Sequence, residues 1–250
     1  MKLKDSVAIV TGGSRDIGRS VSVKLAREGA KVAVNYFSDE VAGQDTLKQI
    51  QDEGGTAILV KGDMTQAADV ANLVAETQSA FGKDIHTLVN VVGGLVARKS
   101  LDEMDEDFFN KVMQLNVNPV FLAMKAVAPH MPSGSSVINL SSQAGRDGGG
   151  PGASVYAASK GAVTTFTRGM AKELGPKGIR VNALCPGMIA TSFHDIFTKD
   201  EVREKVAAST PLRRQGHPDE VADVVAYLAS AESSFLTGVN LDVNGGLLFS

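Results

Sequence analysis

A tyrosine and a lysine stand four residues apart in the stretch Tyr156–Lys160. The residues around them favour a helix, and positions i and i+4 share one helix face, so the phenol and the ammonium reach the same space. A free tyrosine titrates at about pH 10, and a fixed cation nearby lowers the pKa of a phenol toward neutrality. The pair therefore predicts proton transfer, with Tyr156 as the donor in one direction and the acceptor in the other.

Two other polar residues are candidates to join this chemistry. Ser142 follows the apolar run Val137–Leu140, which is typical of a strand. A hydroxyl at the end of such a strand can hydrogen-bond a substrate oxygen as charge develops on it. Asn116 lies within an apolar helical stretch. Taken alone, an amide in those surroundings is typical of a hydrogen-bonded core residue.

A glycine-rich turn, Thr11–Gly18, separates the apolar run Val7–Val10 from a helical stretch at residues 17–28. Glycines let the backbone approach a pyrophosphate closely, and the N-terminus of the following helix attracts phosphates through its free amides and its dipole. This order of strand, turn and helix favours a dinucleotide site over a plain turn. The expected contacts in the turn are Gly12, Ser14, Arg15, Ile17 and Gly18.

The choice between the two nicotinamide dinucleotides depends on the end of the second strand, Lys31–Tyr36, which contacts the adenosine ribose. No Asp or Glu ends this strand to accept a hydrogen bond from a free 2′-hydroxyl, whereas Arg15 can meet a 2′-phosphate. The sequence therefore favours NADPH, places Tyr36 at the ribose, and leaves NADH possible because Asp39 is close.

Further cofactor contacts are expected after the third and fourth strands. Asp63, with Met64 beside it, follows the run Thr56–Val60 and can hydrogen-bond the edge of the adenine. An Asp in such a loop suits an Asx-turn equally well. Asn90 and Gly93 are expected to close the floor of the cofactor site.

Short apolar runs alternate with helical stretches along the whole chain, which is the pattern of parallel strands joined by helical crossovers. The runs are continuously apolar, as strands covered on both faces must be. We therefore expect an α/β fold, a Rossmann-type, doubly wound, seven-stranded parallel sheet in a single domain over residues 1–250, with ligands at the carboxyl ends of the strands. The expected strands are Val7–Val10, Lys31–Tyr36, Thr56–Val60, Thr87–Val92, Val137–Leu140, Ile179–Leu184 and Val239–Val243.

The composition excludes several classes of function. With 25 Lys and Arg against 28 Asp and Glu, a net charge of −3 gives no basic face for nucleic acid. One cysteine, Cys185, rules out a multi-cysteine metal centre, and the four histidines stand too far apart to share a metal, so no metal is expected. No apolar stretch approaches the roughly 18 residues that span a membrane, and the N-terminus lacks the apolar core of a signal peptide. A cytoplasmic protein with no membrane partner is the expectation.

Together these residues resemble the short-chain dehydrogenase/reductase family, in its small single-domain branch, and the resemblance runs along the whole chain. The family's cofactor turn matches Thr11–Gly18, its adenine contact matches Asp63, and its strand-four motif matches Asn90 and Gly93. Its catalytic tetrad falls on Asn116, Ser142, Tyr156 and Lys160. Its nicotinamide-binding segment falls on residues 186–191, with contacts at Pro186, Gly187, Ile189 and Thr191.

The resemblance implies a hydride transfer between a nicotinamide and a carbonyl/alcohol pair, in a homotetramer. It implies that Tyr156 exchanges the proton, while Lys160 lowers the pKa of Tyr156 and holds the nicotinamide ribose. It also implies that Ser142 positions the substrate carbonyl and that Asn116 anchors a water linking Lys160 to solvent. Under this resemblance a purely structural Asn116 becomes the weaker interpretation.

The sequence departs from the family pattern in several places. Asp16 replaces a glycine of the cofactor turn and puts a carboxylate near the phosphates. Val91 and Val92 replace an Asn-Ala pair and remove a polar side chain from the floor of the site. The segment Gln143–Gly152, which precedes the tyrosine, is slightly longer than usual, and this reshapes the rim of the substrate pocket.

The residues around Ser142 suggest a substrate class. Gln143, Arg146 and His194 are polar, and polar groups that converge on a pocket suit a hydroxylated substrate better than an acyl chain. An arginine can bind both oxygens of a carboxylate, although Arg146 could equally pair with Asp147. We therefore expect a keto-sugar or uronate-type small-molecule carbonyl substrate, like a 4-deoxy-5-keto-uronate, reduced with NADPH.

Two other functions stay open. A 3-oxoacyl-[acyl-carrier-protein] reductase needs a basic patch beside its active site because the carrier protein is acidic. The loop His130–Ser136 contains no Lys or Arg, which counts against this alternative. The other alternative is a catalytically silent nucleotide-sensing protein, and the complete set of tetrad residues counts against it.

Overall fold

The computed structural model describes residues 1–249 and contains one sheet in which every neighbouring pair of strands is parallel. The strand order is β3-β2-β1-β4-β5-β6-β7, which confirms the expected seven-stranded, doubly wound, Rossmann-type sheet. The strands are β1 (Val7–Thr11), β2 (Lys31–Tyr36), β3 (Thr56–Lys61), β4 (Thr87–Asn90), β5 (Ser136–Leu140), β6 (Arg180–Pro186) and β7 (Asn240–Val243). β4 is shorter than predicted because the chain leaves the sheet after Asn90.

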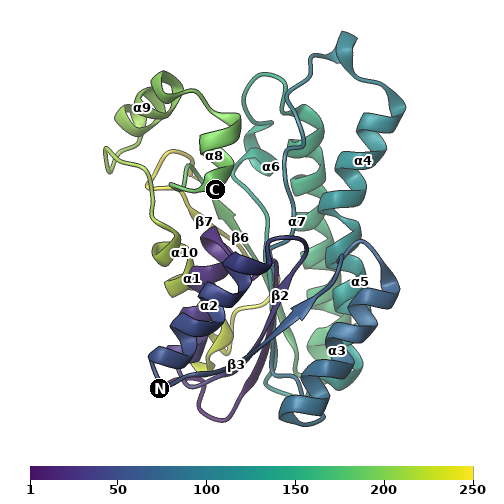
Figure 1. Ribbon diagram of the computed structural model, residues 1–250. Helices are drawn as coiled ribbons and strands as arrows, with labels where there is room; N and C mark the ends of the chain where they lie inside the picture. The colour runs from purple at the N-terminus through teal and green to yellow at the C-terminus, as the bar shows by residue number, and fades with distance from the viewer. Residues whose placement is uncertain (250) are drawn as a thin grey trace.

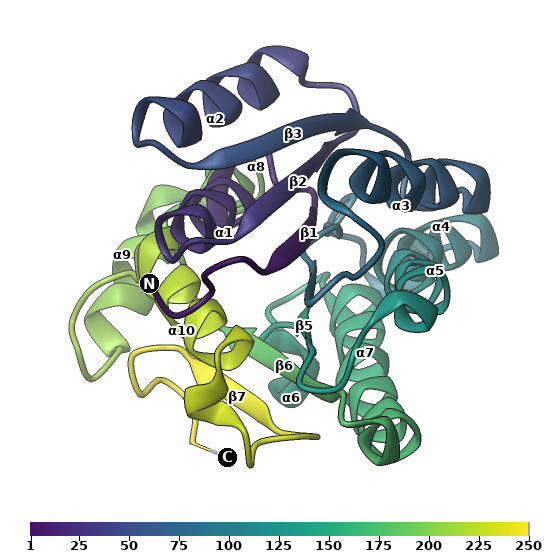
Figure 2. The same cartoon turned by 90° about the horizontal axis from the view of Figure 1, so that it is seen from below.

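Helices cover both faces of this sheet (Figures 1 and 2). One face carries α1 (Asp16–Arg27), α2 (Glu40–Asp52) and α10 (Pro218–Ala229). The other face carries α3 (Ala67–Phe81), α4 (Glu106–Asn116), α5 (Asn118–Val127) and α7 (Ser154–Leu174). The shorter helices α6 (Ala144–Asp147), α8 (Ser192–Phe197) and α9 (Asp200–Ser209) lie in the loops beyond the carboxyl ends of the strands, and single 3-10 turns occur at Leu101–Glu103, Ala128–His130, Gly175–Lys177 and Ala231–Ser233.

The central strands are buried throughout, as a sheet between two helical layers requires. Successive side chains of a strand point to opposite faces. Along β1, Ala8 and Val10 therefore join the core beneath α1 and α10, whereas Ile9 joins the core beneath α3, α5 and α7. Two apolar cores thus hold the sheet from either side.

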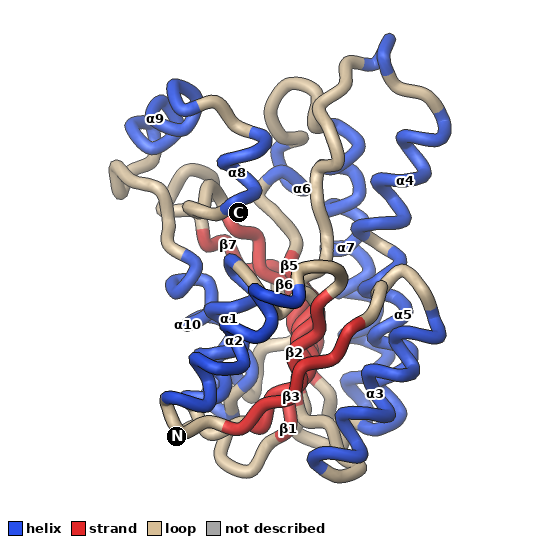
Figure 3. Tube along the Cα trace, viewed as in Figure 1, coloured by secondary structure: helices blue, strands red, loops and turns tan. Residues whose placement is uncertain are grey.

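The strand order reverses at β1, which pairs with β2 on one side and with β4 on the other. Chains that leave β1 and β4 must therefore diverge, and the crevice between them is where open α/β sheets bind ligands. Figure 3 shows the loops from the carboxyl ends gathered at one edge of the sheet, with α6 and α8 among them. Within residues 1–249, none of the helices combines the length and the apolar character needed to cross a bilayer.

Candidate active site

The glycine turn after β1 is held in place from beneath. Gly12 has a φ of +64°, in the left-handed region that glycine tolerates. A Cβ at Gly18 would lie 2.0 Å from the Gly12 carbonyl oxygen, so helix α1 can meet the turn closely only with glycine there. The unpaired amides in the first turn of α1 consequently lie at the crevice, where they can bind a phosphate.

Asn35, at the penultimate position of β2, fixes this turn and was missed in the sequence. Its Oδ1 accepts the amide of Gly12 at 3.0 Å, and its carbonyl accepts the amide of Gly13 at 2.9 Å. Its Nδ2 donates to the Gly62 carbonyl at 3.0 Å, in the loop after β3. A buried amide in an otherwise apolar strand was the available signal, because such a group must find partners.

The residues expected at the adenosine end of the cofactor are Arg15, Tyr36, Asp63 and Met64. The Arg15 side chain is 62% exposed, and Tyr36 is buried. Asp63 Oδ1 accepts from the amide and the hydroxyl of Thr65, at 2.9 and 2.8 Å, which is the Asx-turn considered above. The Met64 side chain is buried in the apolar core as well, so its expected contact with a cofactor stays a prediction.

The floor of the crevice is built from the ends of β4 and β5. Asn90 is buried and its Nδ2 donates to Asn139 Oδ1 at 2.8 Å, so this side chain links the two strands. A Cβ at Gly93 would lie 2.6 Å from Asn116 Oδ1 and 3.0 Å from Lys160 Nζ. Glycine at position 93 therefore lets the backbone pass directly over Asn116 and Lys160.

Lys160 is buried beneath this floor and is firmly positioned. Its Nζ donates to the Leu140 carbonyl at 2.8 Å, and the Ser141 hydroxyl donates to the Lys160 carbonyl at 2.8 Å. Burial disfavours the ammonium and lowers the pKa of Lys160 to about 8. The side chain can thus exchange a proton near neutral pH.

Tyr156 lies one helical turn before Lys160, and the Lys160 Nζ is 5.8 Å from the centre of its ring. Burial raises the pKa of Tyr156, and a hydrogen bond with the Ser142 hydroxyl opposes that rise. The net pKa of Tyr156 is thus raised, because the loss of water around the phenol outweighs the Ser142 hydrogen bond. The Lys160 ammonium is directed at the Leu140 carbonyl, and its lowering of the Tyr156 pKa stays a prediction.

Asn116 ends α4, immediately before α5, and its amide clamps the loop after β4. Its Oδ1 accepts the Gly94 amide, and its Nδ2 donates to the carbonyls of Gly94 and Val112, each at 2.9 Å. The amide is fully satisfied, as the residue taken alone suggested. Its position beside Gly93 and Lys160 also brings it to the tetrad, and its anchoring of a water stays a prediction.

The contacts of the substrate rim differ more from the sequence-based expectations than those of any other part of the site. Arg146 Nε lies 3.0 Å from Asp242 Oδ1, with side-chain exposures of 19% and 14%, and its guanidinium also donates to the Asn240 carbonyl. The guanidinium lies against Cys185 as well. Arg146 therefore faces β6 and β7 and is not free to bind a substrate carboxylate. The expectation that Arg146 contacts the substrate is corrected for this reason. Its partner is Asp242, not Asp147, because a half-buried arginine needs a buried counter-charge.

Gln143 joins the ends of β5 and β6. Its backbone N–H donates to the Pro186 carbonyl at 2.9 Å, and its side-chain Nε2 donates to Asp147 Oδ2 at 2.9 Å. A Cβ on Gly187 would lie 3.1 Å from Gln143 Oε1, so the side chain touches the segment expected to hold the nicotinamide. Gln143 therefore stays a candidate residue of the site, next to Ser142.

An aromatic wall, Phe193 and Phe197 of α8, closes the site opposite Tyr156. The ring of Phe193 lies 5.9 Å from that of Tyr156 and 5.2 Å from that of Phe197. His194 packs edge-on against Phe193 at 5.1 Å, and its Nδ1 meets the Thr198 hydroxyl at 2.9 Å. Burial, followed by the charges of Arg203 and Arg98, lowers the pKa of His194 to about 4, so its imidazole is neutral at pH 7. Sequence reasoning named His194 but missed both phenylalanines.

The glycine turn at residues 11–18 and the segment at residues 186–191, both expected to bind the cofactor, meet at this crevice. The Pro186 side chain is buried at the end of β6, and Gly187, Ile189 and Thr191 lead from it into α8. A nicotinamide dinucleotide laid across the carboxyl ends of the strands would fit this crevice. It would meet the glycine turn at Gly12, the close backbone approach at Gly93 and the Lys160 ammonium. Within residues 1–249, no cluster of His, Cys, Asp and Glu is arranged to hold a metal ion.

Comparisons with known proteins extend over nearly the whole chain. A family model described as Enoyl-(Acyl carrier protein) reductase matches residues 12–248. An uncharacterized oxidoreductase of Methylorubrum extorquens is 36% identical over 98% of this chain and 99% of its own. The (3R)-3-hydroxyacyl-CoA dehydrogenase of Mus musculus is 36% identical over 99% of this chain and 98% of its own. A solved short-chain dehydrogenase/reductase from Serratia marcescens has a TM-score of 0.93 and 33% identity, with 99% of each chain covered.

Proposed function

The chain belongs to the short-chain dehydrogenase/reductase family, and on that premise we propose that it is an NAD(P)(H)-dependent oxidoreductase that interconverts a small carbonyl compound and its alcohol. The observation that carries the proposal is the placing of the Tyr156 phenol, the Ser142 hydroxyl and the buried Lys160 ammonium together beyond β5. A bound nicotinamide supplies the hydride for the reduction.

The side chains of the site divide the remaining work. Ser142 and Tyr156 hold the carbonyl oxygen by hydrogen bonds, which strengthen as negative charge develops on it. Tyr156 donates its phenolic proton to that oxygen, so one O–H bond breaks as the O–H bond of the alcohol forms. Lys160 stabilises the phenolate and would hold the ribose of a bound nicotinamide. The proton returns to Tyr156 through Lys160 and a water at Asn116.

The surroundings of Tyr156 support a carbonyl compound with an apolar or aromatic substituent. The Phe193 ring faces Tyr156, and His194 beside it is neutral. The keto-sugar or uronate favoured by the sequence has less support, because its expected carboxylate partner, Arg146, is paired with Asp242. We place the apolar substituent of the substrate against Phe193 for this reason.

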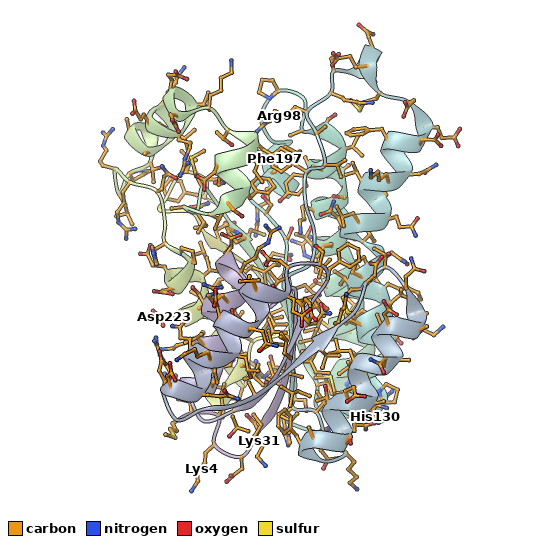
Figure 4. The ribbon with its side chains drawn as sticks, in the orientation of Figure 1. Lys4, Lys31, Arg98, His130, Phe197 and Asp223 are labelled. Carbon is orange, nitrogen blue, oxygen red and sulfur yellow. The ribbon has the colours of Figure 1, made fainter. Side chains whose placement is uncertain are left out.

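A thioester-linked 3-oxoacyl group is the second candidate substrate. The aromatic wall suits an acyl chain, and one relative is named a (3R)-3-hydroxyacyl-CoA dehydrogenase. The loop His130–Ser136, which leads into β5, lacks the basic residues that an acidic acyl carrier protein would need for docking. Figure 4 shows His130 at one end of the strands and Arg98 and Phe197 at the other end. A lack of basic residues near His130 therefore has no bearing on docking at the active site.

Further properties belong to the same proposal. NADPH is the preferred cofactor because the exposed Arg15 is free to meet a 2′-phosphate, and the end of β2 presents no carboxylate to a 2′-hydroxyl. A homotetramer is supported by large apolar side chains exposed at Phe109, Phe121 and Phe249. We place the protein in the cytoplasm, where reduced dinucleotide is available.

The test follows the absorbance of the reduced nicotinamide as NADPH or NADH is oxidised by an aryl ketone, a diketone, an acetoacetyl thioester and a keto-uronate. Turnover of the aryl ketone or diketone with NADPH supports the proposal, and turnover chiefly of the thioester supports the second candidate. Turnover of the keto-uronate alone would refute the apolar pocket. Binding of NADPH without any turnover would point to the nucleotide-sensing alternative.

A matched pair of variants sharpens this test. Phe193→Ala removes the ring opposite Tyr156, and Phe235→Ala removes a phenylalanine that is 101% exposed elsewhere on the surface. We expect the KM for the aryl ketone to rise roughly tenfold in Phe193→Ala, in line with the loss of about 1 kcal/mol or more of aromatic contact. Phe235→Ala should leave that KM unchanged.

A further inference from the structure

Asp16 occupies an unusual position for an aspartate. It stands where the cofactor turn of the family has a glycine, and its φ of +49° lies in the left-handed region. Both of its carboxylate oxygens bind Ser192, which is 176 residues away in the chain. Oδ1 accepts the Ser192 amide at 3.0 Å, and Oδ2 accepts the Ser192 hydroxyl at 2.5 Å.

These two residues belong to opposite sides of the crevice. Asp16 is the first residue of α1, whose N-terminal amides face the expected position of the pyrophosphate. Ser192 is the first residue of α8, whose next residue, Phe193, packs against Tyr156. The contact between Asp16 and Ser192 therefore joins the cofactor turn directly to the aromatic wall of the substrate site.

The far end of α8 is held by a second loop. Arg98 Nε donates to the Phe197 carbonyl at 3.0 Å, and its Nη1 donates to the Pro151 carbonyl at 2.8 Å. Figure 4 shows Arg98 and Phe197 next to each other at the carboxyl edge of the sheet. Helix α8 is thus tied at its start to the cofactor turn and at its end to the loop after β4.

A carboxylate beside a pyrophosphate is costly by itself, because like charges repel. A glycine would avoid that repulsion, so the aspartate needs a compensating role. The two hydrogen bonds from Ser192 draw the carboxylate toward α8, and charge-assisted hydrogen bonds of this kind are among the stronger ones in proteins. The nearest cation, Arg15 Nε, is 4.0 Å from Asp16 Oδ2.

We propose that Asp16 is a positioning residue, which acts as a latch holding α8 over the site so that Phe193 stays against Tyr156 while the dinucleotide is bound. The proposal rests on the proposed function in that it concerns the same site. When the latch is broken, α8 moves away from Tyr156, the carbonyl substrate binds less tightly, and the dinucleotide leaves faster. A change in the cofactor turn is thereby transmitted to the substrate wall.

Three variants separate the hydrogen bonds of the latch from its charge. Asp16→Asn keeps an oxygen for the Ser192 amide and adds an N–H for the Ser192 hydroxyl, so it keeps the latch without the charge. Asp16→Gly restores the residue usual in the family and removes the latch. Asparagine and glycine both tolerate the left-handed region, so neither variant strains the turn. Ser192→Ala removes one of the two hydrogen bonds.

The first measurement needs neither cofactor nor turnover, so it stays informative even if the proposed reaction is wrong. Chymotrypsin cuts after exposed phenylalanines, and cleavage at Phe193 and Phe197 is followed by mass spectrometry. Cleavage at Phe235, which is 101% exposed, is the internal control. We expect cleavage in α8 to be roughly tenfold faster in Asp16→Gly, as expected for the loss of charge-assisted hydrogen bonds, with an unchanged rate at Phe235.

The second measurement compares the dissociation of NADPH, followed by its fluorescence, with the kcat and KM for a carbonyl substrate. Asp16→Gly should release NADPH roughly tenfold faster than Asp16→Asn, which also lacks the charge, and should raise the KM of the carbonyl substrate by a similar factor. Asp16→Asn should lie close to the wild type in proteolysis and in KM, because its neutral hydrogen bonds are weaker but still hold α8, and Ser192→Ala should lie between Asp16→Asn and Asp16→Gly. Wild-type proteolysis of α8 in Asp16→Gly, or equal behaviour of the Asn and Gly variants, would overturn the latch.

Discussion

The proposed catalytic group, Ser142, Tyr156 and Lys160, and the rim around it are held by different kinds of contact. The catalytic side chains depend on backbone groups close to them. Lys160 donates to the carbonyl at the end of β5, and the Ser142 hydroxyl accepts the amide of Ala144. Such contacts come with the strand and helix that carry the residues.

The rim, residues 143–152 together with α8, depends instead on pairs of groups that are distant in sequence. Arg146 pairs with Asp242, and Arg98 reaches the Phe197 carbonyl across 99 positions of the chain. The catalytic side chains are therefore positioned by local contacts, whereas the substrate wall is positioned by pairs of residues distant in sequence. A substitution should therefore affect either the chemical step or the shape of the pocket, depending on its region.

The largest effect is expected for Tyr156→Phe, which removes the proton donor and keeps the ring against Phe193. General acid catalysis contributes about 100- to 10,000-fold, so we expect kcat for carbonyl reduction to fall roughly 1,000-fold. Binding of NADPH, measured by fluorescence titration, should stay within about twofold of the wild type, because the ring and its packing remain.

Tyr227→Phe is the matched control, because Tyr227 lies on α10 and its side chain is partly exposed. Its kcat should equal that of the wild type. If Tyr156→Phe retained more than about a tenth of the wild-type kcat, another group would have to donate the proton. The local encoding of the chemical step would then be disproved.

The next largest effect concerns the buried lysine and the dependence of stability on pH. The pKa of Lys160 is about 8 in the folded protein against 10.5 as its ordinary value, so the unfolded chain binds more protons between these two pH values. The free energy of unfolding should therefore rise from pH 8 to pH 10.5, by up to about 3 kcal/mol from this residue.

Lys160→Met isolates this contribution, because an uncharged side chain of similar length binds no proton. Urea unfolding of the cofactor-free protein at a series of pH values should show the rise in the wild type and a flatter curve in the variant. Lys125→Met, on α5, is the control and should keep the slope of the wild type. Parallel curves for wild type and Lys160→Met would show that Lys160 is not desolvated as the structure indicates.

The same division explains what could be predicted from the sequence. The strands of the sheet follow from continuous apolar runs, and the prediction of the sheet is confirmed. The helix that carries Tyr156 and Lys160 is confirmed as well, while the roles of the two residues stay predictions. The partner of Arg146 could not be predicted, because nothing near position 146 indicates that β7 brings Asp242 to it. The aromatic wall was missed for a similar reason, since Phe193 acquires its meaning only when α8 folds over Tyr156.

A smaller effect is expected for Arg146→Met, which tests whether the rim residue holds the structure or the substrate. The pair with Asp242 is mostly buried, so its loss should lower the free energy of unfolding by about 2 kcal/mol, between the values for exposed and fully buried pairs. The KM values for the aryl ketone and the keto-uronate should keep their ratio. These are measured by urea unfolding and by nicotinamide absorbance.

Asp242→Asn serves as the partner control and should cost a similar free energy, while the double variant should cost less than the sum of the two single ones. A selective rise in the KM for the keto-uronate in Arg146→Met, at unchanged stability, would return Arg146 to the substrate. The rim and the catalytic group would then both act on the substrate directly.

The smallest effect is expected at His194, where the rim itself responds to pH. Burial and the charges of Arg203 and Arg98 lower the pKa of this imidazole to about 4, with Asp195 opposing them, against an ordinary value of 6.5. Between these values the unfolded chain is protonated and the folded chain is not, so stability should fall as the pH drops from 6.5 to 4, by about 2 kcal/mol near the middle of this window. His194→Gln should remove this part of the fall in urea unfolding, whereas His130→Gln, at the opposite edge of the sheet in Figure 4, should not. An identical acid slope in wild type and His194→Gln would mean that α8 opens and hydrates the imidazole before the protein unfolds, so that the wall over Tyr156 is held less firmly than its long-range contacts suggest.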